Sequence, residues 1–345
     1  MGRRPNTAPA GISPLKSIKV RAVYRAVRVS GQTAPYDTLT LKLYYPANYG
    51  GSFEERNTGF IPADSSRAPF PIVVLMPGVN VPLESYSWLA HKLVEAGFAV
   101  ASYSWIANEM GDLVSISPGV HIKRLTHKRY GKKPSCPALP AIFSELKKLN
   151  KKGLLADQLD LSSIIIGGHS AGGTMALLNA NHDWFSGIRG AFAYAAHTGG
   201  NVSLGWEEDS IMPLSKDVPL LIMGGTRDGV IANSAFRYGE AEQGSPTERI
   251  ERTFSEGVQG KRGDRHLVLI EGANHFAMAW PKDHSTGRPF LDQKTQGSNK
   301  KIRKYLARLI VTFCDQACSG DPMSKADLRA LCDDGQPMVA LSEHK

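Results

Sequence analysis

The sequence predicts an α/β fold, with a mostly parallel central sheet, helices on both faces of the sheet and an antiparallel hairpin at one edge. First, short apolar runs alternate with segments of helical periodicity, which is typical of parallel strands joined by helical crossovers. Second, the runs 72–76 and 163–166 are apolar and β-branched, which indicates strands buried on both faces. Third, apolar and polar residues alternate in 18–30 and 38–46, which predicts the hairpin.

The remaining elements follow in order from the same patterns. Short apolar runs predict strands, helices are expected where apolar residues recur every three or four positions, and stretches rich in Gly, Pro, Ser and Asn are expected to be loops. The helix over 84–96 has Gly97 as its C-cap, and the helix over 300–318 has an apolar face that would close the domain against the sheet. Further strands are expected over 98–103, 188–195, 219–223 and 266–270, and further helices over 138–151, 174–180 and 232–243.

Length and composition fit one domain with flanking segments. A chain of 345 residues with 42% hydrophobic content can bury a large core. We expect a flexible N-terminal arm over 1–17 and a single domain over 18–318 that carries a basic insertion loop at 104–135. Residues 319–345 are expected to form a C-terminal tail that could hold a short helix near 325–331, and partner binding and disorder are both open for it.

The net charge of +9 favours anionic surfaces or substrates, since charge steers association. No helix-turn-helix, zinc-ligand or RNA-binding pattern accompanies the basic residues, so no nucleic-acid partner is expected. Arg3 and Arg4 are not followed by an apolar segment, so no signal peptide is expected. No apolar run approaches the roughly 20 residues of a transmembrane helix. A cytoplasmic protein is therefore expected.

Four cysteines do not make a disulfide framework in a chain of this length. A bridge between Cys318 and Cys332 is left open. Cys314 and Cys318 are four residues apart, but no histidine pair accompanies them, so we interpret them as packing residues. No metal and no organic cofactor are expected.

A strand, a tight turn and a helix follow one another around the motif Gly168-His169-Ser170-Ala171-Gly172. This pattern predicts a nucleophile elbow, in which a strained turn lifts the serine hydroxyl above the sheet. The glycines have no Cβ, so neighbouring backbone can approach closely and the serine can hold an unfavourable φ/ψ. The five residues recur by chance in many chains, so the strand before and the helix after them carry the interpretation.

Acid and base candidates follow the serine in the chain. Asp228 comes directly after the strand 219–223, and His275 comes after the strand 266–270. A carboxylate that accepts a proton from the histidine Nδ1 fixes the ring tautomer, and the histidine then takes the serine proton. The order Ser170, Asp228, His275 therefore predicts a catalytic triad.

Other residues compete for these two positions. Asp209 and Asp264 are weaker acid candidates because neither directly follows a comparable strand. His266 lies inside a strand and His284 lies further along the chain, so both are weaker base candidates. His197 follows the end of the strand 188–195 and is the main competitor for the base.

On these motifs the chain resembles a serine hydrolase of the α/β-hydrolase superfamily over roughly 18–315. The Met-Pro-Gly loop at 76–78 and the compact layout resemble dienelactone-hydrolase-like proteins, chlorophyllases and cutinase-like polyester hydrolases. Two departures leave the subfamily open. Dienelactone hydrolases proper have a cysteine where this chain has Ser170, and plant chlorophyllases have an arginine where it has Ala171.

The resemblance also implies an oxyanion hole. In this fold the loop after the strand 72–76 supplies one backbone amide and the residue after the nucleophile supplies the other. We assign these amides to Val79 and Ala171. Substrate contacts are expected from side chains near the same strand ends: Asn80, His169, His197, Thr198 and Phe276.

A basic segment lies in the insertion loop. No acidic residue occurs between Asp112 and Glu145, while six cations cluster there. The segment follows the carboxyl end of a strand, so it could steer an anionic substrate to the site. A solvated loop leading into the next helix is the simpler interpretation. The cations are Lys123, Arg124, Lys128, Arg129, Lys132 and Lys133.

Together these observations predict a carboxylic-ester hydrolase that works through Ser170, His275 and Asp228 and forms an acyl-enzyme. The expected substrate is a small-molecule ester, with an apolar or an anionic acyl group. A thioesterase or an acyltransferase would use the same triad. A non-catalytic binding protein on a hydrolase scaffold is the alternative of a different class. The oligomeric state is not indicated.

Overall fold

The computed structural model describes residues 19–110, 113–238, 244–260, 262–283, 289–333 and 335–345. The expected N-terminal arm, residues 1–17, and His284 lie outside the described residues. The strands are β1 (Lys19–Arg28), β2 (Thr38–Ala47), β3 (Phe70–Met76), β4 (Ala99–Met110), β5 (Leu113–Ser117), β6 (Leu159–His169), β7 (Ile188–Tyr194), β8 (Leu220–Gly225), β9 (Arg265–Ile270) and β10 (Val339–His344).

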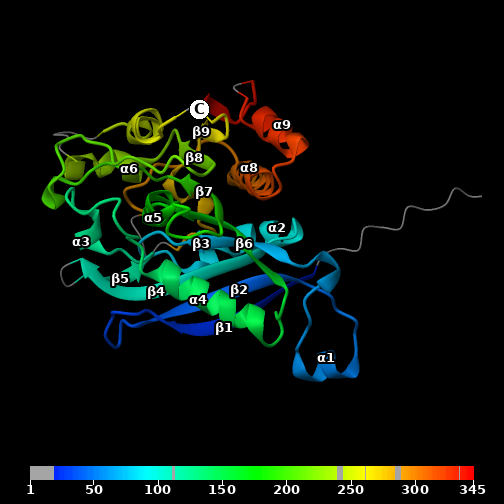
Figure 1. Cartoon of the computed structure of the whole chain (residues 1–345). Coiled ribbons are helices and arrows are strands. Elements are labelled where there is room, and N and C mark those ends of the chain that lie inside the picture. Colours follow the sequence, from blue (N-terminus) through cyan, green and yellow to red (C-terminus); the bar gives the residue numbers. More distant parts are fainter. Residues whose placement is uncertain (1–18, 111–112, 239–243, 261, 284–288, 334) are drawn as a thin grey trace, which may run out of the picture.

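These strands form one mixed sheet in the order β1-β2-β4-β3-β6-β7-β8-β9-β10, with β5 paired to β4 beside this path (Figure 1). The pairs from β4 through β9 are parallel, in agreement with the apolar, β-branched runs. β1 and β2 form the expected antiparallel hairpin, and β1 is an edge strand. The carboxyl ends of β3, β6, β7, β8 and β9 therefore lie along one edge of the sheet.

Helices connect and cover the strands. The helices are α1 (Phe53–Thr58), α2 (Ser87–Glu95), α3 (Ile122–Leu125), α4 (Ala138–Lys151), α5 (Ala171–Asn179), α6 (Gly229–Asn233), α7 (Glu248–Arg252), α8 (Asn299–Ser319) and α9 (Pro322–Leu331). Short 3₁₀ turns occur at Ser65–Arg67, Leu83–Tyr86, Val202–Leu204, Ala235–Tyr238 and His275–Met278, and a π-turn occurs at Thr253–Gly257.

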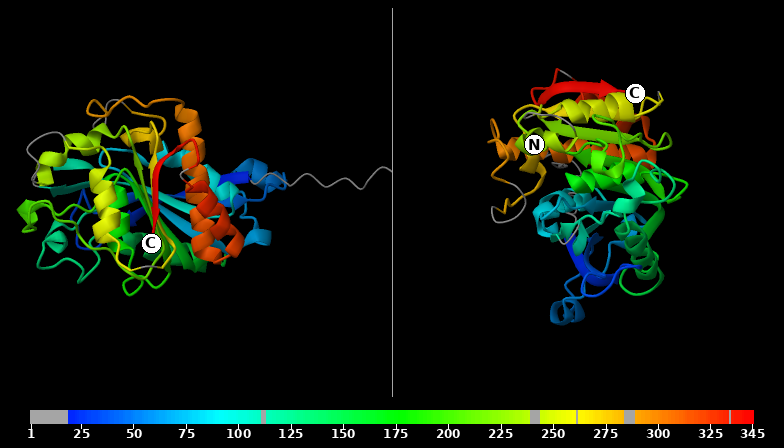
Figure 2. Two further views of the ribbon diagram at one scale, coloured as in Figure 1. Left: turned by 90° about the horizontal axis from the view of Figure 1, so that it is seen from above. Right: turned by 90° about the vertical axis from the view of Figure 1, so that its left-hand side faces the viewer.

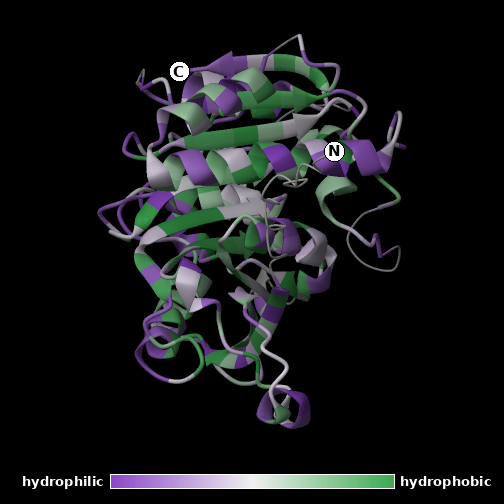
Figure 3. Cartoon of the chain, turned by 90° about the vertical axis from the view of Figure 1, so that its right-hand side faces the viewer, coloured by the Kyte–Doolittle hydropathy of each residue, from purple (hydrophilic) through white to green (hydrophobic). Residues whose placement is uncertain are grey.

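Two apolar layers sandwich the sheet, because successive strand residues point to opposite faces. Ile164 and Ile166 belong to one cluster together with residues of α4 and α5. Ile165 belongs to the other cluster, which includes residues of α2, α8 and α9. Figure 2 shows β1 and β10 at opposite ends of the molecule, and Figure 3 shows hydrophobic residues concentrated along the strands. The prediction of helices on both faces is confirmed.

The C-terminal segment 319–345 differs from the expected tail. α9 packs against α8, and β10 pairs antiparallel with β9, so this segment completes the sheet at its second edge. Tyr305 of α8 donates a hydrogen bond from its hydroxyl to the Leu331 carbonyl at 2.6 Å. β10 is short and half polar, and its pairing joins residues far apart in the chain, so its sequence pattern does not distinguish it from a tail.

Two internal segments also differ from expectation. In the insertion 104–135, β4 continues to Met110 and pairs antiparallel with β5, so the first half of the expected loop is a strand pair. The helix expected over 232–243 is only the end of α6 and a 3₁₀ turn, and residues 239–243 lie outside the described residues.

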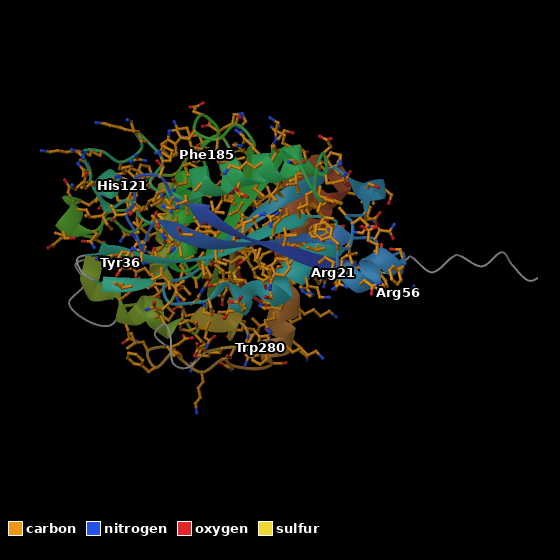
Figure 4. The ribbon with its side chains drawn as sticks, turned by 90° about the horizontal axis from the view of Figure 1, so that it is seen from below. Arg21, Tyr36, Arg56, His121, Phe185 and Trp280 are labelled. Carbon is orange, nitrogen blue, oxygen red and sulfur yellow. The ribbon has the colours of Figure 1, made fainter. Side chains whose placement is uncertain are left out.

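The residues labelled in Figure 4 identify the end of the molecule at which the parallel strands have their carboxyl ends. Figure 4 shows Tyr36, in the turn between β1 and β2, and His121 toward one end of the molecule, and Arg56 of α1 toward the other. The Tyr36 end is the carboxyl edge, because Thr40 pairs with Ser104 near the end of the parallel part of β4. Within the described residues no helix is long and apolar enough to cross a membrane. All four cysteines, Cys318 and Cys332 included, are free thiols.

Candidate active site

Ser170 occupies a strained turn between β6 and α5. Its φ is 54° and its ψ is −127°, values that cost free energy for a residue with a side chain. The flanking glycines let the backbone of β3 pack directly against the turn. A Cβ on Gly172 would lie 2.2 Å from the Met76 carbonyl oxygen. A Cβ on Gly168 would lie 2.6 Å from that same oxygen. The glycine spacing seen in the sequence thus has the steric cause that was predicted.

Asp228 and His275 meet at the carboxyl edge of the sheet. Asp228 follows β8 and caps α6, and His275 follows β9. The His275 Nδ1 lies 2.9 Å from Asp228 Oδ2 and 3.0 Å from Oδ1. Both side chains are buried. Since a carboxylate only accepts hydrogen bonds, Nδ1 carries the proton, and the neutral ring keeps Nε2 free of a proton and able to act as a base.

The charge environment of His275 favours its protonated form. Burial by itself would lower the pKa of His275, but Asp228, through its charge and its hydrogen bond, and Asp292, through its charge, raise that pKa above its ordinary value. Lys282 acts in the opposite direction. An imidazolium formed here would therefore be stabilised, as a base that takes up a proton requires.

His169, expected to contact substrate, is instead a structural residue. Its ring is fully buried and both nitrogens bond to protein. Nε2 donates to the His275 carbonyl oxygen at 2.9 Å, and Nδ1 accepts from the Tyr86 hydroxyl at 3.0 Å. The Tyr86 oxygen in turn accepts from the Gly78 amide at 3.0 Å. Burial, with the nearby His275, lowers the pKa of His169 well below its ordinary value, so the ring is neutral.

Tyr194 at the end of β7 links the serine to the histidine loop. Its carbonyl accepts from the Ser170 amide at 2.9 Å, and its hydroxyl donates to the Asn274 carbonyl at 2.6 Å. The segments of Ser170 and His275 are therefore connected by two sets of hydrogen bonds, one through His169 and one through Tyr194. Within the described part of the chain no hydrogen bond joins the Ser170 hydroxyl to the His275 ring. Such contacts often tighten only when substrate binds.

The loop after β3 packs against the serine. A Cβ on Gly78 would lie 3.4 Å from the Ser170 Cβ. The Gly78 amide is committed to Tyr86 and the Asn80 amide donates to the Ile116 carbonyl at 2.9 Å. The Asn80 Oδ1 accepts from the Ile116 amide at 3.1 Å, so this oxygen ties the loop to β5 and is not free for the expected substrate contact. The Val79 amide therefore lies between two amides, those of Gly78 and Asn80, that already donate hydrogen bonds within the protein.

The other expected substrate contacts differ in exposure. Thr198 is fully buried, and its hydroxyl donates to the Met212 carbonyl at 3.0 Å, so it supports the loop after β7 and has no exposed surface for the expected substrate contact. His197 lies on the same loop and is nearly buried. Phe276 is half-buried, with the Lys282 ammonium 5.2 Å from its ring centroid. Of these residues, Phe276 is the one with an accessible side chain beside His275.

The weaker acid candidates have other partners. Asp209 pairs with Arg252 and lies 3.5 Å from Arg249. Asp264 pairs with Arg262 at 2.9 Å. Each is paired with arginine, as ordinary ion-pairing carboxylates are.

Three residues of the site were missed from the sequence. Tyr86 and Tyr194 supply the hydroxyls that connect the loops, and Asp292 bonds to the backbone of the histidine loop. Tyr86 lies in what reads as a helix, and Asp292 lies in a stretch with no periodicity, so neither carries a signal in the sequence. In the described residues no group of three or more His, Cys, Asp or Glu side chains could hold a metal ion.

Comparison with known proteins supports the fold. No protein-family model and no curated protein matches the chain. Among solved structures, the chain is similar to a ferulic acid esterase from Streptomyces cinnamoneus, with 15% sequence identity and a TM-score of 0.56. The alignment covers 90% of this chain and 93% of that chain. At this identity the likeness establishes a shared mixed α/β fold over nearly the whole length of both proteins.

Proposed function

We propose that this protein is a serine hydrolase of the α/β-hydrolase fold that cleaves carboxylic esters. The observation that carries the proposal is the buried His275–Asp228 pair, with Nδ1 at 2.9 Å from Oδ2, at the same sheet edge as a serine on a positive-φ turn. Strain and a buried histidine–carboxylate pair coincide where the catalytic geometry needs them. The esterase named by the structural comparison supports the same class of reaction.

In the proposed first step, the Ser170 Oγ attacks the ester carbonyl carbon while its proton passes to the His275 Nε2. Asp228 holds the Nδ1 proton and stabilises the imidazolium without taking that proton itself. The carbonyl π electrons move to oxygen, which becomes an oxyanion. We assign its two donors to the backbone amides of Val79 and Ala171, the second of which opens α5. The helix N-terminus adds a favourable dipole there.

The intermediate then collapses. The bond between the carbonyl carbon and the alcohol oxygen breaks, and the leaving alcohol takes the proton from the His275 Nε2. The product of this step is an acyl-enzyme on Ser170. A water molecule attacks the acyl carbon and gives its proton to His275, and the serine oxygen leaves with that proton. The acid is released and the enzyme returns to its starting protonation state.

The test is covalent labelling followed by a comparison of substrates. A fluorophosphonate probe should label the wild-type protein at Ser170, and Ser170→Ala should abolish labelling. The control is Ser162→Ala, an exposed serine at the opposite end of the same strand, β6, which should leave labelling intact. Wild-type protein without labelling would contradict the proposal and favour a binding protein. Faster turnover of acyl-thioesters than of nitrophenyl esters would shift the assignment to a thioesterase.

A further inference from the structure

Asp292 makes three hydrogen bonds to backbone at the centre of the candidate site. Its Oδ1 accepts from the His275 amide and from the Gly229 amide, both at 3.2 Å. Its Oδ2 accepts from the Phe276 amide at 3.3 Å. One carboxylate therefore contacts the backbone of the histidine itself, of the residue after it, and of the residue that follows Asp228.

We propose that Asp292 is a positioning residue for the hydrolysis proposed above: it fixes the loop of His275 against the loop of Asp228, so that the two side chains meet. It does not contact the reacting atoms. Its effect is transmitted through the backbone of both loops.

The chain around Asp292 supports this function, because neighbouring residues bond to the same two loops. The Leu291 carbonyl accepts from the Asn233 side chain at 3.1 Å, at the end of α6. The Gln293 carbonyl accepts from the Asn274 side chain at 2.7 Å, one residue before His275. The segment 291–293 thus crosses both loops and holds each of them by hydrogen bonds on either side of Asp292.

A carboxylate suits this position better than a neutral side chain. It has two acceptor oxygens and no donor, so it satisfies three amides that all donate. Hydrogen bonds to a charged acceptor are also stronger than neutral ones. An asparagine would keep one acceptor oxygen but would direct an NH₂ group at one of the amides. The expected defect of Asp292→Asn is therefore local, since its volume matches that of aspartate.

The charge of Asp292 has a second consequence. Burial raises the pKa of Asp292 itself, and the protonated form of His275 opposes that rise. The same interaction helps to raise the pKa of His275. Removing the charge must lower the pKa of His275, so the neutral base persists to lower pH. The titratable or charged groups that act on His275, or that surround it, are Asp228, Asp292, Lys282, His169, His197 and Tyr194.

The experiment combines kinetics with a titration that does not depend on activity. Asp292→Asn and Asp292→Ala should lower kcat/KM for a nitrophenyl ester roughly tenfold and up to 10²-fold, because a shift of about 1 Å in catalytic geometry can cost that much. In the Asn variant the acidic limb of the pH–kcat/KM profile should move to lower pH. NMR titration of ¹⁵N-histidine-labelled protein should show the same displacement for His275.

Glu271→Gln is the matched control. It removes one negative charge from the same loop, four residues before His275, on an exposed side chain. It should change neither the rate nor the titration of His275. If Asp292→Asn left both the pH limb and the NMR titration of His275 unchanged, Asp292 would be only a scaffold residue and the proposal would be wrong.

Failure of the proposed function can be told apart from failure of the Asp292 proposal. A wild-type protein that hydrolyses no ester and takes no fluorophosphonate would contradict that function, while the NMR titration would still report on Asp292 and His275. A global folding defect in Asp292→Ala would appear as a lowered melting temperature. The near-isosteric Asn variant then provides the decisive comparison.

Discussion

The loops after β7 and β9 each hold a nearly or fully buried histidine, yet their surroundings have opposite electrostatic effects. His275, after β9, has the carboxylate of Asp228 on its Nδ1 and a raised pKa. His197, after β7, has no such partner among its contacts in the described residues: its Nδ1 accepts from the Gly199 amide at 3.1 Å. Burial, with the positive charges of Arg249 and His275, lowers the pKa of His197 to about 3.

The difference shows that burial does not select a base. Burial lowers the pKa of any histidine, and a neighbouring carboxylate is needed to reverse that effect. A lowered pKa makes a histidine ring a poorer acceptor for the proton of a serine. This contrast favours His275 over His197 as the proposed base, although both follow parallel strands at the same sheet edge.

The sharpest way to break this comparison is to remove each histidine in turn. If the proposed function holds, His275→Ala should lower kcat roughly 10³-fold or more, as the loss of the triad base does in serine hydrolases. His197→Ala should lower kcat by less than about tenfold, since His197 supports a loop and takes no proton in the proposed mechanism. Steady-state ester hydrolysis measures both. If the two losses were reversed, the base would be His197.

Asp228→Asn tests the origin of the difference and should have the second largest effect. Without the carboxylate, the His275 ring loses the partner that fixes its tautomer. We therefore expect kcat to fall, but by a factor one to two orders of magnitude smaller than the factor for His275→Ala. The residual activity should show its acidic limb at lower pH, because removing a negative charge lowers the pKa of His275. An unmoved limb would mean that another group controls the profile.

A third buried histidine, His169, extends the comparison because it bonds to the backbone of His275. Tyr86→Phe removes the hydroxyl that bonds both His169 and the Gly78 amide, so two buried groups lose their partner. We expect a loss of about 1–3 kcal/mol in the free energy of unfolding and roughly tenfold in kcat.

The matched control is Tyr45→Phe. Tyr45 is buried and donates from its hydroxyl to the Ile61 carbonyl at 2.9 Å, away from the catalytic loops. It should reduce stability in denaturant unfolding without changing kcat. Equal kcat in Tyr86→Phe and Tyr45→Phe would show that the hydrogen bonds from Gly78 through Tyr86 to His169 do not position the candidate site.

Local signals in the sequence predicted the strands other than β5 and β10, the elbow and the proximity of Asp228 to His275. Parallel strands end at one edge, so residues directly after β8 and β9 must be close. Positions that depend on packing between distant segments were not predictable. The contact of Asp292 with His275 joins two loops, and its residue type is common in turns. His169 was misassigned because the sequence does not say which neighbour of Ser170 faces inward.

The final prediction concerns the outer side of the His197 loop, where the basic segment lies. Trp206 donates from its indole nitrogen to the Leu125 carbonyl at 2.8 Å, and Tyr130 donates to the Pro213 carbonyl at 2.5 Å. These bonds fasten the segment to the loop after β7, near the carboxyl edge of the sheet. Four cations of the segment, Lys128, Arg129, Lys132 and Lys133, are exposed. The basic segment is thus fastened to a loop that follows a parallel strand at its carboxyl end, the end that holds the candidate site, and steering of an anionic ester requires such a position.

If steering operates, kcat/KM for an anionic ester should fall several-fold as salt rises, because the Debye length shrinks from about 10 Å at 0.1 M to about 3 Å at 1 M. A neutral ester should respond little. Replacing Lys128, Arg129, Lys132 and Lys133 with Gln should flatten the salt dependence and leave kcat for the neutral ester unchanged, since the proposed catalytic residues are untouched. The matched control replaces three lysines and one arginine on α8: Lys300, Lys301, Lys304 and Arg308. This change removes the same total charge from a helix that covers the sheet, so it should preserve the dependence. If both quadruple variants gave identical salt curves, the basic segment would be an ordinary solvated surface. The two histidine loops would then differ only in the buried surroundings of His275 and His197.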